Sequence, residues 1–199
     1  AANTLVRTPE GWSADCTDVD GVTGALQAVG YTPGPTATVL GAGGTACAAL
    51  AGLAAMGVTT ATVVVRNPTR ATEAVACAKA TGLAVVVSPW ATTDFATLAA
   101  TSSVVVNTTP PDAVTPVVPA LSQAPCVLDV IYHPWPTPLA TAVTNEGGVV
   151  ATGLDMLLHQ AFGQVEQFTG RPAPRSAMRD ALRAKTGNIL PLPLKSTKD

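Results

Sequence analysis

The chain has 199 residues, of which 47% are hydrophobic and 12% are charged, about half the charged share of an ordinary globular protein. This composition excludes a highly charged, disordered chain and predicts a folded domain with a large core. Because 11 Lys and Arg residues stand against 13 Asp and Glu residues, we expect no basic surface that binds nucleic acid. No apolar run approaches the roughly 20 residues of a membrane helix, and the first ten residues do not resemble an export signal, so we expect a cytoplasmic protein with no membrane partner.

The central part of the chain alternates between strand-like and helix-like segments, which is typical of a parallel sheet covered by helices. In chain order we predict a strand at 36–40, a helix at 44–56, a strand at 61–65, a helix that begins at Pro68, and strands at 83–87, 103–107, 126–131 and 149–151. The strands are almost wholly apolar, which indicates a sheet buried on both faces. The predicted fold class is α/β, a doubly wound, Rossmann-like parallel sheet.

Two helices and a tail follow the alternating part. Apolar residues recur at spacings of three and four at Leu154, Leu158, Ala161, Val165 and Phe168. Residues 153–169 are therefore predicted to form an amphipathic helix, and 174–184 a shorter one. The apolar stripe leaves open a homodimer that covers it. Residues 186–199 contain two prolines and no periodic pattern, so we predict a mobile tail.

A glycine-rich turn separates the first predicted strand of the sheet from its helix. Its sequence, Gly41-Ala42-Gly43-Gly44-Thr45-Ala46, matches the G-x-G-x-x-A pattern of dinucleotide-binding turns in the required strand, turn and helix order. Gly41 permits the tight turn, and Gly43 lets a pyrophosphate approach the backbone. Free N–H groups at the helix start favour this anion. The alternative is a glycine turn that only closes a packed β–α unit.

The end of the second predicted strand indicates which dinucleotide binds. NAD sites usually place an Asp or Glu here for the ribose 2′-hydroxyl, whereas this chain reads Val65-Arg66-Asn67-Pro68-Thr69-Arg70. Arg66 and Arg70 flank a helix start, where two guanidinium groups can bind a 2′-phosphate through charge-assisted hydrogen bonds. The sequence therefore favours NADP, with an ordinary pair of solvated arginines as the alternative.

The cysteines and histidines show no metal-binding pattern. The four cysteines are scattered and form no Cys-x-x-Cys pair, at Cys16, Cys47, Cys77 and Cys126. Only His133 and His159 could join them, and we expect both to be structural or exposed. We therefore predict reduced, mostly buried thiols and no metal site.

Six motifs occur in a fixed order along the chain. They are Asn3-Thr4-Leu5, Ala14-Asp15-Cys16-Thr17-Asp18-Val19-Asp20-Gly21, the Gly41 turn, Asn107-Thr108-Thr109-Pro110, Asp129-Val130-Ile131-Tyr132 and Gly153-Leu154-Asp155-Met156-Leu157-Leu158-His159-Gln160-Ala161. Together they resemble shikimate dehydrogenases, and most of all the actinobacterial, mycobacterial-type members. The resemblance implies NADP-dependent, reversible reduction of 3-dehydroshikimate to shikimate, a step of aromatic amino-acid biosynthesis.

The resemblance also implies roles for individual residues. Asp18 is similar to the catalytic aspartate, which shares proton transfer with a lysine, and Asn3, Tyr132 and Gln160 are similar to substrate contacts. The implied cofactor contacts are Gly41, Ala42, Gly43, Gly44, Arg66, Asn67, Arg70, Thr108, Gly153 and Met156. The residues themselves leave alternatives open, because an Asp at this place often caps the following helix. Tyr132 can be a half-buried aromatic residue and Gln160 a packed or solvated one.

The chain departs from the family pattern in two places. The family motif before the aspartate reads Gly-x-Asn-Thr-Asp, and Ala14 and Cys16 stand in the Gly and Asn places. A thiol cannot replace the two-way hydrogen bonding of an amide, so we expect a different loop before Asp18. The family's Asn-Arg-Thr reads Val65-Arg66-Asn67, which keeps the arginine and loses one hydrogen-bonding contact.

The resemblance divides the chain into four segments: a remnant of a substrate domain at 1–17, an NADP-binding domain at 18–152, helices that return to the substrate domain at 153–185, and the tail at 186–199. Family members begin with a substrate domain that carries the catalytic lysine. We therefore expect a truncated chain that is inactive alone. Two alternatives stay open: a non-catalytic NADP-binding or interaction module, and a related enzyme that acts on quinate or with NAD.

Overall fold

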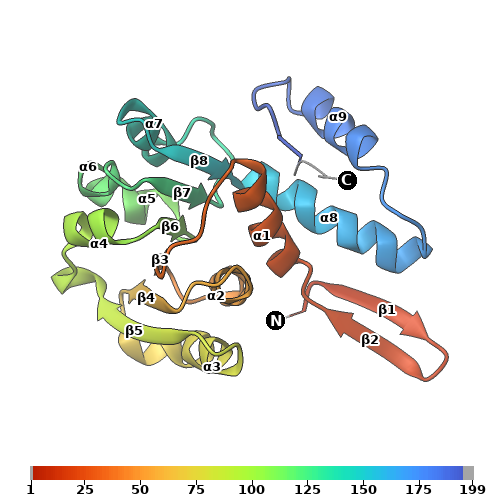
Figure 1. The fold of residues 1–199 in the computed structure, drawn as a ribbon, viewed down its shortest axis with the longest axis horizontal. Helices are drawn as coiled ribbons and strands as arrows, with labels where there is room; N and C mark the ends of the chain where they lie inside the picture. The colour runs from red at the N-terminus through yellow and green to blue at the C-terminus, as the bar shows by residue number, and fades with distance from the viewer. Residues whose placement is uncertain (1, 195–199) are drawn as a thin grey trace.

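The computed structural model describes residues 2–194, and its centre is a six-stranded parallel sheet (Figure 1). The strands are β3 (Thr36–Leu40), β4 (Thr60–Val65), β5 (Ala84–Pro89), β6 (Val104–Asn107), β7 (Cys126–Asp129) and β8 (Val149–Thr152). Their order across the sheet is β5-β4-β3-β6-β7-β8, so the direction of winding reverses between β3 and β6. This is the order of a doubly wound dinucleotide-binding fold. The predicted fold class is confirmed.

Helices cover both faces of this sheet. One face carries α1 (Asp18–Ala28), α2 (Gly44–Ala55) and α3 (Thr72–Ala80); the other carries α4 (Phe95–Thr101), α5 (Pro111–Val114), α6 (Val118–Leu121) and α7 (Pro138–Asn145) (Figure 1). Three short 3₁₀ turns complete the connections, η1 (Pro68–Ala71), η2 (Trp90–Thr92) and η3 (Thr115–Val117). Successive strand residues alternate between the two cores: Val39 packs under the first set of helices, and Leu40 under the second. Two buried faces explain why the strands are almost wholly apolar.

The predicted strands match the observed ones closely, and the largest differences lie in β5, which runs from Ala84 to Pro89 where 83–87 was predicted, and in β7. The prediction extended this strand to Ile131, but it ends at Asp129. The Asp129 carboxylate accepts a hydrogen bond from the Ile131 N–H at 3.2 Å, which turns the backbone away from the sheet. Side chains of Asn107 and Thr137 also donate to this carboxylate, at 3.0 and 2.6 Å. Burial raises the pKa of Asp129, and these hydrogen bonds oppose that rise.

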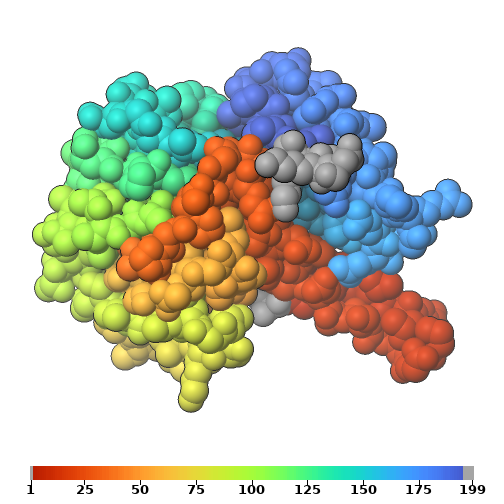
Figure 2. Space-filling model, in the orientation of Figure 1, coloured from red at the N-terminus to blue at the C-terminus, as the bar shows by residue number. Residues whose placement is uncertain are grey.

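Residues 4–15 form an antiparallel hairpin that the sequence analysis did not predict. Its strands are β1 (Thr4–Thr8) and β2 (Gly11–Asp15), which pair in register from Thr4 with Asp15 to Thr8 with Gly11. Figure 2 shows this hairpin, in red, standing out from the body of the molecule. It is attached to the C-terminal helix region through hydrogen bonds from Gln164 to Thr4 and from Gln167 to Asp15.

Two C-terminal helices follow the sheet, α8 (Gly153–Thr169) and α9 (Arg175–Lys185). The α8 helix begins with a capping box between Thr152 and Asp155. Its first residue is Gly153, as predicted. It runs along α1, and glycines on α1 allow the two backbones to approach closely. A Cβ at Gly21 would lie 2.8 Å from the Met156 carbonyl oxygen, and one at Gly24 would overlap the His159 ring. These contacts make α8 part of the same packed body as the sheet.

Part of the predicted mobile tail packs against α8. Leu190 and Leu192 are buried against Leu154, Leu158 and Phe162 of this helix. The mobility of the tail stays a prediction, and residues 195–199 lie outside the described part of the chain. The same contact covers Leu154 and Leu158 of the apolar stripe of α8. Phe168 at the end of the stripe stays exposed.

The cysteines are free, as predicted, but they are not mostly buried. Only Cys126 is buried, and burial raises the pKa of its thiol to about 12. Residues 2–194 contain no cluster of three His, Cys, Asp or Glu side chains that could hold a metal ion. Within the same residues, no helix is long and apolar enough to cross a membrane.

Candidate cofactor and substrate site

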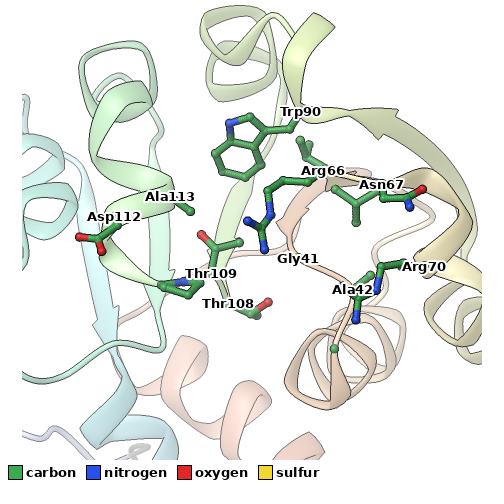
Figure 3. A pocket seen from close by; sticks show the side chains of 14 residues that line it. Gly41, Ala42, Arg66, Asn67, Arg70, Trp90, Thr108, Thr109, Asp112 and Ala113 are labelled. Carbon is green, nitrogen blue, oxygen red and sulfur yellow. The ribbon is translucent and has the colours of Figure 1, made fainter.

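A cavity of about 980 Å³ opens at the carboxyl ends of β3, β4 and β6, where the winding of the sheet reverses (Figure 3). Ligands of doubly wound folds bind at this position. Seven of the ten predicted cofactor residues line the cavity: Gly41, Ala42, Gly43, Arg66, Asn67, Arg70 and Thr108. Residues from three separate parts of the chain therefore meet in one cavity.

The glycine turn has the close contacts that its sequence predicted. Gly41 has a φ of +106°, a conformation that residues with a side chain rarely adopt. A Cβ at Gly41 would also overlap the hydroxyl of Thr108, which donates a hydrogen bond to the Leu40 carbonyl at 2.7 Å. At Gly43, by contrast, a Cβ would meet no atom within 4 Å. The first glycine is required by the fold, and the second leaves free space in front of the backbone.

The start of α2 faces this free space with unsatisfied N–H groups. Gly43 is the N-cap residue and brings no side chain to cap the helix. The N–H of Cys47 donates to the Gly43 carbonyl at 3.0 Å, so the N–H groups of Gly44, Thr45 and Ala46 precede the first α-helical hydrogen bond. Together with the positive end of the helix dipole, these groups form an anion site suited to a pyrophosphate. Gly44 acts through its backbone and does not line the cavity.

Arg66 directly follows β4 and Arg70 lies in η1, and both are on the side of the cavity next to the glycine turn (Figure 3). Both side chains are exposed, and neither forms an ion pair within residues 2–194. Between them, the Asn67 carboxamide oxygen accepts hydrogen bonds from the Thr69 N–H at 3.1 Å and the Thr69 hydroxyl at 2.8 Å. Asn67 thus caps η1 and fixes the backbone that carries both arginines. Two cations without a carboxylate partner fit a phosphate group.

Several residues of the cavity were not predicted from the sequence. They are Val64, Val65, Trp90, Thr109, Pro110, Asp112 and Ala113. Thr109 could have been found, because the segment after β6 lies across the reversal point from the glycine turn. Asn107 holds it there, since its side-chain oxygen accepts hydrogen bonds from the Thr109 N–H at 3.0 Å and the Thr109 hydroxyl at 2.7 Å.

A second group of predicted residues meets beside the start of α1. The Asn3 carboxamide donates to the Asp18 carboxylate and to the Gln160 side-chain oxygen, each at 2.9 Å. Its oxygen accepts hydrogen bonds from the Thr4 hydroxyl and the Thr17 N–H, also at 2.9 Å. We call Asn3, Asp18 and Gln160 the polar cluster. The Asn3 side chain, with all its donors and acceptors in hydrogen bonds, therefore joins Asp18, which is 15 positions away in the sequence, and Gln160, which is 157 positions away.

The structure excludes the alternative that Asp18 caps the following helix. Thr17 is the N-cap residue of α1, and Asp18 is the first helical residue, with its carboxylate turned to Asn3. Two hydrogen bonds fix the loop before Asp18. The Thr17 N–H donates to the Asn3 side-chain oxygen, and the Val19 N–H donates to the Cys16 carbonyl at 3.1 Å. Burial raises the pKa of the Cys16 thiol, and the nearby Asp18 charge raises it further.

Three further predicted residues lie outside the cavity. Gly153 begins α8 at the carboxyl end of β8, where a Cβ would overlap the Val130 carbonyl and approach the Tyr132 ring at 2.9 Å. Tyr132 is 47% exposed, and no hydrogen bond in the described residues joins it to the polar cluster. Met156 is buried in the core against Gly21 of α1. Its side chain offers no surface to the cavity, so its role beside a nicotinamide stays a prediction.

The sheet connects the two groups of residues. Because β3, β6, β7 and β8 are parallel neighbours, Gly41, Thr108, Val130 and Gly153 follow one another along the same edge. Gln160 lies seven residues further along α8, about 10 Å along the helix axis. The cavity thus lies at this edge, and α8 leads from the edge at Gly153 to the polar cluster at Gln160.

Comparisons with known proteins agree with this arrangement. Residues 153–183 match the model of the Shikimate 5'-dehydrogenase C-terminal domain. The curated Shikimate dehydrogenase (NADP(+)) of Moorella thermoacetica is 33% identical over 94% of this chain and 66% of its own length, and that of Aeropyrum pernix is 34% identical over 94% and 69%. The crystal structure of Mycobacterium tuberculosis shikimate dehydrogenase is similar with a TM-score of 0.84 and 52% identity, covering 92% of this chain and 68% of that one.

The chain spans about two thirds of the length of these relatives. The sequence similarity extends over almost the whole chain, and the sheet, glycine turn and C-terminal helices are all included in it. The chain belongs to the shikimate dehydrogenase family.

Proposed function

We propose that the chain is the NADP-binding part of an enzyme that reversibly reduces 3-dehydroshikimate to shikimate. The curated relatives carry NADP(+) in their names, and the observation that carries the proposal here is the cavity. It combines a glycine turn that admits no side chain at Gly41, a helix start with free N–H groups, and the unpaired Arg66 and Arg70. These features fit the pyrophosphate and the 2′-phosphate of NADP.

NADPH held by the glycine turn, Arg66 and Arg70 would supply a hydride to the carbonyl carbon of the substrate, and the resulting alkoxide would need a proton. Asp18 is suited to take part in this proton transfer, because its carboxylate belongs to the polar cluster and is only partly exposed. Asn3 occupies one carboxylate oxygen, Oδ1, and the other makes no hydrogen bond within the described residues. Oδ2 is thus available to a substrate hydroxyl.

Asn3 and Gln160 position the substrate. Asn3 has every donor and acceptor in use, so its orientation is fixed, and it in turn holds the Gln160 side chain by its oxygen. The Gln160 amide N–H groups make no hydrogen bond within the described residues, so they can donate to hydroxyl or carboxylate oxygens. A polyhydroxylated acid needs several such partners. The polar cluster supplies an acid–base group and a hydrogen-bond donor at fixed relative positions.

Cofactor selectivity tests the cavity assignment. Arg66→Ala should weaken NADP⁺ binding roughly 10- to 100-fold, because a charge-assisted hydrogen bond contributes about 1.5–3 kcal/mol. Binding of NAD⁺, which has no 2′-phosphate, should change little. Isothermal titration calorimetry measures both, with Arg7→Ala on the exposed hairpin as the matched control. Equal losses for NADP⁺ and NAD⁺ would contradict a 2′-phosphate site at Arg66.

Turnover separates the proposed enzyme from a non-catalytic NADP-binding module. The chain is mixed with the N-terminal third of the Mycobacterium tuberculosis relative, shikimate and NADP⁺, and NADPH absorbance is followed. An enzyme gives shikimate-dependent NADPH, which Asp18→Asn should reduce by about 10²- to 10⁴-fold. NADP⁺ binding without turnover in any such mixture would favour the non-catalytic module.

A further inference from the structure

Trp90 is a cavity residue outside every motif that identified the family. It begins η2, directly after β5, and is half-buried. Its ring packs against Phe95 of α4, with ring centroids 4.9 Å apart and planes inclined by 59°. Phe95 is itself buried in the core below. The indole is therefore held by the core on one side while it lines the cavity on the other.

The cavity has two chemically different parts. Arg66, Arg70 and the start of α2 make one part cationic and rich in N–H groups. Figure 3 shows Trp90 beside the Arg66 side chain, with Ala113 across the cavity and away from the glycine turn. A flat aromatic ring thus adjoins the guanidinium group that the proposed function assigns to a ribose 2′-phosphate.

One part of NADP is flat, apolar on its faces and joined directly to that ribose. We infer that Trp90 binds the adenine base of the dinucleotide, with Ala113 leaving the space that the base fills. This inference rests on the proposed function, because it assumes that the phosphate beside Arg66 belongs to NADP. The ribose that carries the 2′-phosphate also carries the base, so the two subsites must be neighbours, as Arg66 and Trp90 are.

The inference predicts a pattern of affinities that differs from that of the arginine variant. Stacking of a base on an aromatic side chain increases the binding affinity roughly 5- to 100-fold. Because NADP⁺ and NAD⁺ share the adenine base, Trp90→Ala should weaken both by the same factor, whereas Arg66→Ala should weaken NADP⁺ alone. Trp90→Phe keeps an aromatic ring and should retain most of the affinity.

Calorimetry with fragments of the cofactor locates the effect. Adenosine 2′,5′-bisphosphate contains the base and both phosphates of the adenosine half, and it should lose the same factor as NADP⁺ in Trp90→Ala. Nicotinamide mononucleotide, which has no adenine, should be unaffected. Because loss of the Phe95 contact could disturb the fold, Ala113→Phe provides a second variant that leaves Trp90 and Phe95 in place. It should fill the adenine space and weaken adenosine 2′,5′-bisphosphate about 10-fold or more.

Fluorescence gives an independent readout. The chain contains three tryptophans, Trp12, Trp90 and Trp135, and only Trp90 lines the cavity. Saturable quenching by adenosine 2′,5′-bisphosphate should disappear in Trp90→Phe while calorimetry still shows binding. Unchanged affinities in both Trp90→Ala and Ala113→Phe would overturn the inference and leave the proposed function intact. Failure of the unaltered chain to bind either NADP⁺ or the bisphosphate would overturn the proposed function as well.

Discussion

Replacement of Gly41 by alanine tests whether the glycine turn is built as the structure describes it. The change adds one methyl group to a residue with φ of +106°, and that methyl would overlap the Thr108 hydroxyl. A residue with a side chain in such a conformation loses about 1–2 kcal/mol. Thr108 must also move, which breaks its 2.7 Å hydrogen bond to the Leu40 carbonyl and removes about 0.5–1.5 kcal/mol more. We expect Gly41→Ala to lower the free energy of unfolding by about 1.5–3.5 kcal/mol.

Gly57 provides the matched control. Its φ of +96° is nearly the same, but a Cβ there would meet no atom within 4 Å. Gly57→Ala therefore measures the conformational part alone, about 1–2 kcal/mol. The difference between the two variants isolates the contact with Thr108. Shortening Thr108 to alanine in the Gly41→Ala background should cause little further loss of stability, because the hydrogen bond to the Leu40 carbonyl is already broken.

Urea unfolding followed by circular dichroism gives the free energies, and calorimetry gives the NADP⁺ affinity of the same variants. Gly41→Ala should also weaken NADP⁺ binding, because Thr108 lines the cavity and is displaced, whereas Gly57→Ala should bind normally. Equal destabilisation by Gly41→Ala and Gly57→Ala would show that the close approach of Gly41 and Thr108 is wrong. The proposed position of the pyrophosphate would then lose its geometric support.

Two further predictions concern the contact between α8 and the segment after α9. Burial lowers the pKa of His159, so the folded state favours the neutral ring. The free energy of unfolding is therefore unaffected by this group above the unfolded pKa of about 6.5 and decreases as the pH falls below it. Urea unfolding at pH 7.5 and 5.5 should show this loss, His159→Gln should reduce it, and His133→Gln, at an exposed site, should leave it unchanged. Leu192→Ala should lower the free energy of unfolding by about 2–5 kcal/mol, because the side chain is fully buried, whereas Ile189→Ala at an exposed site should change it by less than about 0.5 kcal/mol. A similar small effect of both substitutions would contradict the buried segment.

The sheet and the glycine turn could be predicted because their signals are local. Each strand is a short apolar run with two buried faces. A glycine is needed at position 41 because its φ is positive and because the Thr108 hydroxyl leaves no space for a Cβ. The arginines could be predicted for a related reason, since the end of β4 and the start of η1 are adjacent in the sequence. In these places the property that matters lies within a few residues of the chain.

Other features depend on contacts between distant residues and could not be predicted. The β1–β2 hairpin alternates buried and exposed residues only in β1, while β2 is wholly exposed, so the usual pattern of a half-buried strand is missing. Leu190 and Leu192 lie among prolines and have no period, yet they fill a space on α8. Trp90 reaches the cavity only because β5 is the neighbour of β4. The polar cluster was assembled from a family resemblance, and the structure adds the hydrogen bonds of Asn3 that hold it.

The polar cluster also determines what the 199-residue chain can do by itself. The cavity that fits NADP is lined wholly by residues of this chain, so cofactor binding should be retained. A substrate would meet Asn3, Asp18 and Gln160, of which Asn3 is exposed and the others are partly exposed. Lys79 lies on α3 and Lys185 ends α9, and none of the hydrogen bonds or ion pairs in the described residues joins either to the polar cluster. One exposed cluster cannot fix a polyhydroxylated acid in one orientation.

We therefore expect the chain alone to bind NADP⁺ and to oxidise shikimate far more slowly than a complete enzyme. Positioning of reactants contributes about 7–11 kcal/mol to catalysis, and an acid–base partner contributes a further 10²- to 10⁴-fold. The described residues provide neither a fixed substrate position nor such a partner for Asp18, so we expect little rate. The assay follows NADPH absorbance with shikimate and saturating NADP⁺, with Asp18→Asn as the control. A turnover of about one per second or more that disappears in this control would refute the expectation. It would mean that residues assigned here to the fold complete a substrate site around Asp18.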